Sequence, residues 1–217
     1  MAGRIRRLLR NRPTGRVDLA AVPALAAAAG APGGKAGLSP SAALARRLLA
    51  EQLAGLAAER CRVLGPGRLV TAETLPFVCR MEPLPADDAT LADPAELDCL
   101  LVGDALAAAD DPLSMLRRIV TAPLAGAARR LLVVLPGTAL LPDDAAPCPR
   151  RWLFSGVSGA ATASRVLGER AGSVMVLGNV LAAATDLLGL GADRLWPEEL
   201  DADDPEYPMV VALTTQG

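Results

Sequence analysis

Apolar residues recur along the chain with two different spacings, which predict an alternation of strands and helices. Short apolar runs are typical of strands that are covered on both faces of a sheet. Such runs lie at 61–64, 77–81, 97–102, 130–135, 173–177 and 207–214. Apolar residues spaced three and four apart predict helices at 39–59, 112–121, 155–169 and 179–190. This alternation predicts an α/β fold with a Rossmann-like, doubly wound sheet, and the two late strands predict that the final strand inserts antiparallel.

Two of these helices begin with capping signals. Ser39 precedes Pro40, and Asp111 precedes Pro112. A side-chain oxygen at the N-cap accepts a hydrogen bond from a free backbone N–H, and proline suits the first helical position because it has no N–H to satisfy. We therefore expect helices to begin at Pro40 and Pro112, and we assign no chemistry to Asp111.

The chain divides into a basic arm and one domain. A segment at 31–37 contains three glycines and a proline, so it predicts a boundary between an arm at 1–37 and a domain at 38–217. The arm carries arginine at positions 4, 6, 7, 10, 12 and 16, ahead of an alanine-rich stretch at 20–29. Asp18 precedes that stretch and Pro23 interrupts it, so we expect no signal peptide and a cytoplasmic protein. The arm is either a solvated basic segment or a patch for an acidic partner or a lipid headgroup.

The composition excludes several classes of function. The chain has no histidine, which removes the usual general base, the commonest metal ligand and the histidine-containing nucleophile triads. Its four cysteines are widely spaced and predict buried free thiols, and the acidic residues at 198–206 lack the spacing of a calcium loop. A net charge of −2 disfavours nucleic-acid binding, and no apolar run is long enough to span a membrane. We expect no metal, no nucleic acid and no membrane span.

Small and acidic residues follow the predicted strands at the sheet edge where ligands of such folds bind. Gly65 and Gly67 follow the first strand, where small residues let the backbone approach a cofactor closely. Glu82 ends the second strand, where an acid accepts hydrogen bonds from the hydroxyls of a ribose. Asp93 and Asp104 lie near strand ends at the same edge and complete the candidate cofactor-binding set. The alternatives are an ordinary turn at the glycines, a solvated carboxylate at Glu82 and a capping role for Asp104.

Four segments carry motifs of a known family. Residues 97–137 run from Leu-Asp-Cys-Leu-Leu-Val-Gly-Asp to Val-Val-Leu-Pro-Gly. In the tail, residues 151–155 read Arg-Trp-Leu-Phe-Ser, residues 177–183 read Leu-Gly-Asn-Val-Leu-Ala-Ala, and residues 198–208 include Glu-Glu-Leu-Asp and Asp-Pro-Glu-Tyr-Pro. The first segment resembles motifs IV and V of class I S-adenosylmethionine-dependent methyltransferases. The tail resembles the W-R-F-T, G-N-V-L-A-A and E-E-L-D…D-P-x-Y-P elements of a type-11-like bacterial subgroup.

This resemblance implies a class I methyltransferase fold and a protein that transfers a methyl group from S-adenosylmethionine to a small-molecule or glycan-type acceptor. It implies that Gly65 and Gly67 cradle the cofactor and that Glu82 holds its ribose. The chain departs from the family where Gly65 replaces the acid of motif I and Leu153 replaces the arginine of W-R-F-T. A second hypothesis is therefore a catalytically inactive methyltransferase-fold binding or scaffold module beside a glycosyltransferase or another sugar-modifying enzyme. A third, a nicotinamide-dependent oxidoreductase, requires a fuller glycine fingerprint.

Overall fold

A computed structural model of the chain describes residues 37–89, 91–92, 96–140 and 152–215. The predicted arm, apart from Gly37, lies outside the described residues, as do Asp93 and Cys148. No helix in the described ranges is long and apolar enough to cross a membrane.

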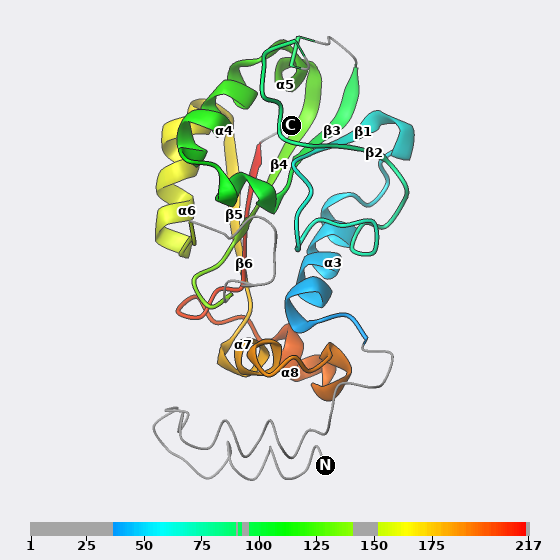
Figure 1. The fold of residues 1–217 in the computed structure, drawn as a ribbon, viewed down its shortest axis with the longest axis vertical. Coiled ribbons are helices and arrows are strands. Elements are labelled where there is room, and N and C mark those ends of the chain that lie inside the picture. The colour runs from blue at the N-terminus through cyan, green and yellow to red at the C-terminus, as the bar shows by residue number, and fades with distance from the viewer. Residues whose placement is uncertain (1–36, 90, 93–95, 141–151, 216–217) are drawn as a thin grey trace.

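The described residues form one six-stranded sheet with the order β2-β1-β3-β4-β6-β5 (Figure 1). Its strands are β1 (Cys61–Leu64), β2 (Arg80–Glu82), β3 (Leu97–Val102), β4 (Ala128–Pro136), β5 (Ala171–Leu177) and β6 (Val210–Thr215). The first four strands pair in parallel, whereas β6 inserts between β4 and β5 and is antiparallel to both. This topology confirms the predicted doubly wound α/β sheet with an antiparallel final strand.

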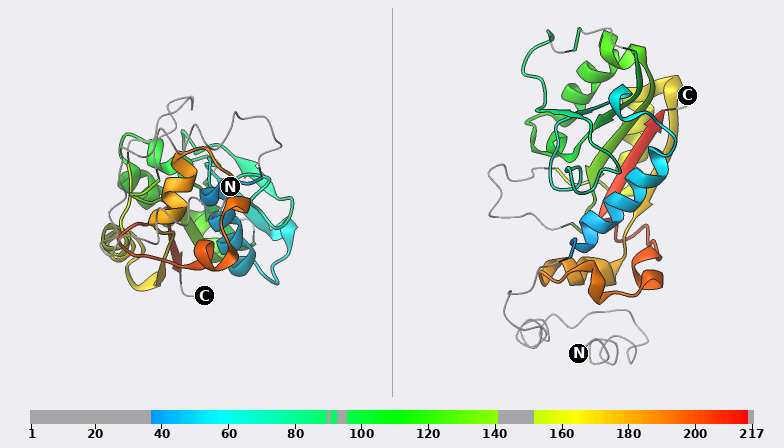
Figure 2. Two further views of the ribbon diagram at one scale, coloured as in Figure 1. Left: turned by 90° about the horizontal axis from the view of Figure 1, so that it is seen from below. Right: turned by 90° about the vertical axis from the view of Figure 1, so that its right-hand side faces the viewer.

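Helices cover both faces of the sheet and one end of it (Figures 1 and 2). One face carries α4 (Pro112–Thr121), α5 (Pro123–Ala127) and α6 (Gly156–Thr162), and the other carries α3 (Pro40–Gln52). The end where the parallel strands finish carries α7 (Val180–Leu187) and α8 (Pro197–Asp201). Shorter 3₁₀ or π turns lie at Ala58–Arg60, Asp104–Ala108, Ala163–Leu167, Gly168–Arg170 and Ala192–Arg194.

The sheet is covered on both faces because its central strands are apolar on both. Along β4, Leu131, Val133 and Leu135 enter the core layer beneath α4 and α5, whereas Leu132 and Val134 enter the layer beneath α3. All five are fully buried. A strand whose alternate side chains enter two separate layers must lie inside a three-layer fold, which places ligand access at the sheet's ends.

The capping predictions are confirmed, but several elements end elsewhere than the pattern indicates. The side chains of Ser39 and Asp111 accept hydrogen bonds from backbone N–H groups at the starts of α3 and α4. The first helix stops at Gln52 and not near residue 59, and Gly55 follows it with a φ of +77°, which a helix cannot continue. The helix predicted at 155–169 is α-helical only as far as Thr162, where a π turn begins.

The second strand is shorter and later than its apolar run indicates. It occupies residues 80–82, while Phe77 and Cys79 pack from the preceding loop against the core layer beneath α3. The whole connection between β1 and β2 contains no helix in its described residues, 65–79. This loop shapes the candidate site.

Candidate cofactor site at the carboxyl ends of the strands

Four of the five predicted site residues meet at one end of the sheet. Gly65 follows β1, Glu82 ends β2, and Asp104 follows β3. Backbone hydrogen bonds join these strand ends, because the Gly65 N–H donates to the Glu82 carbonyl at 2.7 Å and the Gly103 N–H donates to the Leu64 carbonyl at 2.8 Å. The fifth residue, Asp93, lies outside the described ranges.

Gly65 makes the turn that leaves β1. Its φ is +63°, in the left-handed region that favours glycine. A Cβ atom placed on this glycine would lie 2.6 Å from Cγ and one Cδ of Leu84. The space beside the turn is therefore already filled by a leucine side chain of the same chain.

The carboxylate of Asp104 holds the loop that follows Gly67. Asp104 is only 3% exposed, and its two oxygens accept hydrogen bonds from three consecutive backbone N–H groups: Arg68 at 2.9 Å, Leu69 at 2.9 Å and Val70 at 3.1 Å. A Cβ on Gly67 would lie 2.6 Å from the carboxylate. Gly67 therefore allows the close approach of Asp104, and the amides beyond it are directed at that carboxylate rather than at an open cleft.

Glu82 is engaged in an ion pair within the sheet. Its Oε2 accepts from Nη2 of Arg62 at 2.6 Å and from Nε at 3.1 Å, and Arg80 contacts its other oxygen. The strand register places Arg62 opposite Arg80 and Leu64 opposite Glu82, so Arg62 and Glu82 are diagonal neighbours on one face. The side chains of Arg62 and Glu82 are 6% and 15% exposed. A ribose would have to compete with a largely buried guanidinium for this carboxylate.

As they are arranged, these residues do not fit S-adenosylmethionine. Leu84 and Asp104 occupy the space beside the two glycines, and Glu82 is neutralised by arginine. Cofactor loops of doubly wound folds also offer the N-terminus of a helix to the ligand, and residues 65–79 form no helix here. The site residues meet at one end of the sheet, but the carboxylates of Glu82 and Asp104 are held by other groups of the same chain.

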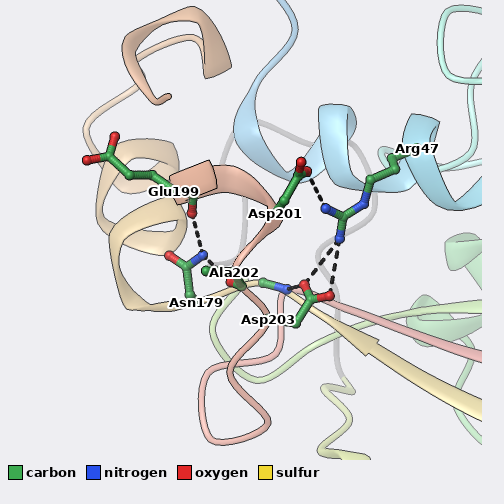
Figure 3. Close-up of polar contacts among 7 residues, drawn as sticks. Arg47, Asn179, Glu199, Asp201, Ala202 and Asp203 are labelled. Atoms are coloured by element: carbon green, nitrogen blue, oxygen red, sulfur yellow. Dashed lines mark hydrogen bonds and ion pairs between the residues drawn. The ribbon is translucent and has the colours of Figure 1, made fainter. Parts of the chain in front are cut away.

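A second polar cluster joins the tail to the first helix (Figure 3). Arg47 on α3 contacts Asp201, and its Nη2 donates to both oxygens of Asp203 at 3.2 Å. The same Asp203 accepts from the backbone N–H of Gly178 at 3.0 Å. Arg47 carries no local sequence signal, because both acids lie more than 150 positions later in the chain.

Asn179 fixes the neighbouring turn. Its side-chain oxygen caps α7 by accepting from Ala182 at 2.9 Å, while its amide donates to the carbonyls of Glu199 and Ala202 at 2.8 and 2.5 Å. In Figure 3 these contacts lie beside the Arg47 cluster. Residues 178–179 and 199–203, together with Arg47, therefore hold α3, α7 and α8 together.

A groove of about 490 Å³ lies between α3 and the edge strand β5, at the end near α8. Three carboxylates, one guanidinium and four apolar side chains form its walls: Glu51, Asp201, Asp203, Arg47, Leu48, Met175, Val176 and Leu177. The pattern of apolar residues gave no indication of this groove.

Two of the described cysteines lie opposite each other in β1 and β3, and a third lies just before β2. Cys61 and Cys99 are partners in the β1–β3 register, and Cys79 precedes the residue paired with Arg62. All three are free thiols; Cys61 and Cys99 are buried as predicted, whereas Cys79 is only half-buried. Burial is the main cause that raises the pKa of Cys61 to about 11 and of Cys99 to about 12. No group of metal-ligating side chains suited to an ion occurs among the described residues.

The strand order and the antiparallel final strand define a Rossmann-like α/β fold of the class I methyltransferase type. No protein-family model matches the chain, and no curated protein matches it significantly. Among solved structures, an S-adenosylmethionine-dependent methyltransferase from Mesorhizobium loti is 15% identical with a TM-score of 0.39, covering 79% of this chain and 96% of its own. The YcgJ protein from Bacillus subtilis is 14% identical with a TM-score of 0.36, covering 79% and 94%. Such distant similarities assign no activity, so the fold class depends on the strand order.

Proposed function

We propose that this protein is a catalytically inactive binding or scaffold module with a methyltransferase fold. The observation that carries the proposal is the position of Asp104, whose carboxylate lies against Gly67 and binds three loop amides. A negative charge that is held by three N–H donors occupies the position at which the loop would otherwise meet a ligand.

Two further contacts support the same function. Leu84 fills the space beside Gly65, and Arg62 pairs with Glu82. Binding S-adenosylmethionine would require moving a packed leucine and breaking a largely buried ion pair, and each of these changes costs free energy. We also propose that the module binds a partner, and the resemblance implies that this partner is a glycosyltransferase or another sugar-modifying enzyme.

The second candidate is an active methyltransferase that acts on a small-molecule or glycan-type acceptor. The glycine turn at the end of β1, with its φ of +63°, favours it. A chain without histidine is compatible with such an activity, because methyl transfer depends on proximity and orientation more than on a general base. This candidate requires Leu84 and Asp104 to withdraw when S-adenosylmethionine binds.

Calorimetric titration of the whole chain distinguishes the two candidates. We expect no saturable heat with S-adenosylmethionine or S-adenosylhomocysteine at ligand concentrations of about 1 mM, and no increase in melting temperature, because a ligand that binds the native state stabilises it. Saturable binding at one site per chain that is lost in Gly67→Ala would overturn the proposal.

Two variants show whether any heat comes from the predicted site. Gly67→Ala places a methyl group against Asp104 and should abolish binding that uses the loop. Gly126→Ala is the matched control, because a Cβ there has no neighbour within 4 Å. Heat that is equal in the wild type and both variants would be binding elsewhere and would leave the candidate site without cofactor.

A further inference from the structure

Strand β5 is an edge of the sheet, irregular in its pairing with β6 between Ala171 and Val174 and regular from Val174 to Leu177, the part that contains its groove-lining residues. It lies at the end of the strand order, and in the described part of the chain its outward N–H and C=O groups face no further strand. Its seven residues, Ala-Gly-Ser-Val-Met-Val-Leu, include no charge and no proline. The opposite edge, β2, has three residues, two of them charged. Charged, short strands discourage pairing with another segment, and long uncharged ones permit it.

The groove beside this edge has an apolar floor and an acidic rim. Leu48, Met175 and Leu177 supply apolar surface, and Glu51 is exposed on α3 at the rim. Asp201 and Asp203 line the same groove and share one guanidinium, that of Arg47. With three carboxylates against one arginine, the groove retains net negative charge. It suits an extended, basic segment that also carries apolar residues.

The chain itself contains such a segment. Residues 1–17 include six arginines and no acid, interspersed with leucine, isoleucine and valine. The described chain begins at the same end of the molecule as the groove, because the Leu38 carbonyl accepts from Ala192 at 2.8 Å just before α8. The 20 residues between Arg16 and Gly37 span up to about 70 Å when extended. That length exceeds the distance across a domain of this size, whose radius of gyration is about 16 Å.

We infer that the arginine-rich segment 1–17 binds in the groove between α3 and β5 of its own chain, with its arginines against the rim of Glu51, Asp201 and Asp203. The backbone edge of β5 holds the segment without regard to its sequence, and the charges select a basic one. This inference is independent of whether the protein binds S-adenosylmethionine. It also implies that a partner using the same groove must displace the arm.

Trypsin cleavage of the whole chain tests this inference, because trypsin cuts after the arginines of the arm and a bound segment resists cleavage. The measurement is the rate at which residues 1–16 are lost, followed by intact mass at low ionic strength. Glu51→Arg reverses an exposed charge of the rim, and we expect cleavage to be about fivefold faster than in the wild type. Glu73→Arg, on an exposed loop residue that does not line the groove, should cleave at the wild-type rate.

High salt provides the second part of the test. At about 0.5 M salt the wild type should be cleaved as fast as Glu51→Arg, because screening removes the attraction that holds the arm. Equal rates for the wild type and Glu51→Arg at low salt would overturn the inference. Protection that increases with protein concentration would also overturn it, because the arm would then be bound to a second copy.

Discussion

The three hydrogen bonds to Asp104 predict a large loss of stability when its carboxylate is removed. Hydrogen bonds to a charged group contribute about 1.5–3 kcal/mol each, and a deleted acceptor leaves buried donors unsatisfied. The Arg68 amide is partly exposed and can donate a hydrogen bond to water instead, whereas the Leu69 and Val70 amides donate to Asp104 in buried surroundings. We expect Asp104→Ala to lower the free energy of unfolding by about 3–5 kcal/mol.

Asp104→Asn separates the acceptor role from the charge. Its remaining carbonyl oxygen can still accept from Leu69 and Val70, while its amide group faces the Arg68 N–H, so we expect a smaller loss of about 2 kcal/mol. The assay is urea unfolding followed by circular dichroism, with the slope unchanged between variants. Asp88→Ala, whose carboxylate is 81% exposed, is the control and should change stability by less than about 1 kcal/mol.

Gly67 provides an independent measurement of the same contact. A Cβ at this position would overlap the Asp104 carboxylate, so Gly67→Ala should cost about 1–3 kcal/mol. In the double variant with Asp104→Ala the overlap disappears, and the combined loss should be smaller than the sum of the two single losses. If Asp104→Ala costs less than about 1 kcal/mol, or if the two losses add, the loop is not held as we describe.

Two further predictions concern buried groups in the strands. Glu82→Gln should lower the free energy of unfolding by about 2–4 kcal/mol in a urea titration, because Arg62 loses a largely buried charged partner. Replacing both residues by methionine should recover at least half of that loss. A double variant as unstable as the single one would contradict this. Cys61 and Cys99 should resist iodoacetamide at pH 8 in the native protein and react in the unfolded one, because burial raises the pKa of the two thiols to about 11 and about 12. Both pKa values lie above the ordinary thiol value of 9.0, so the native state retains these protons at a pH where the unfolded state loses them. The free energy of unfolding should therefore be constant below about pH 8 and fall between about pH 9 and 11. An increase over that range would contradict the assignment.

The sequence predicts those parts of the fold whose causes are local. The helix that begins at Pro112 is fixed by Asp111 before it and by apolar residues at helical spacing within it, and it ends at Thr121 as the pattern indicates. The strand at 97–102 is likewise determined by its own apolar residues. Such elements depend on neighbours within one or two turns, which a sequence displays directly.

The state of the candidate site depends on contacts between distant positions, and the sequence does not display these. Glu82 is 20 positions from Arg62, and Asp104 is 34 to 36 positions from the amides that it binds. A glycine turn and an acid at a strand end have the same local pattern whether they face a ligand or their own chain. That these residues meet at one end of the sheet was therefore predictable, whereas the contacts that their side chains make with the rest of the chain were not.

The position of β6 also bears on the order in which the protein forms during synthesis. This last strand separates β4 from β5, and β4 ends 74 positions before β6 begins. At about 5–20 residues per second, the ribosome supplies β6 roughly 4–15 s after β4 is complete. During that interval β4, and β5 once residue 177 has been made, each lack their partner strand, which leaves unpaired apolar edges open to chaperones until β6 emerges.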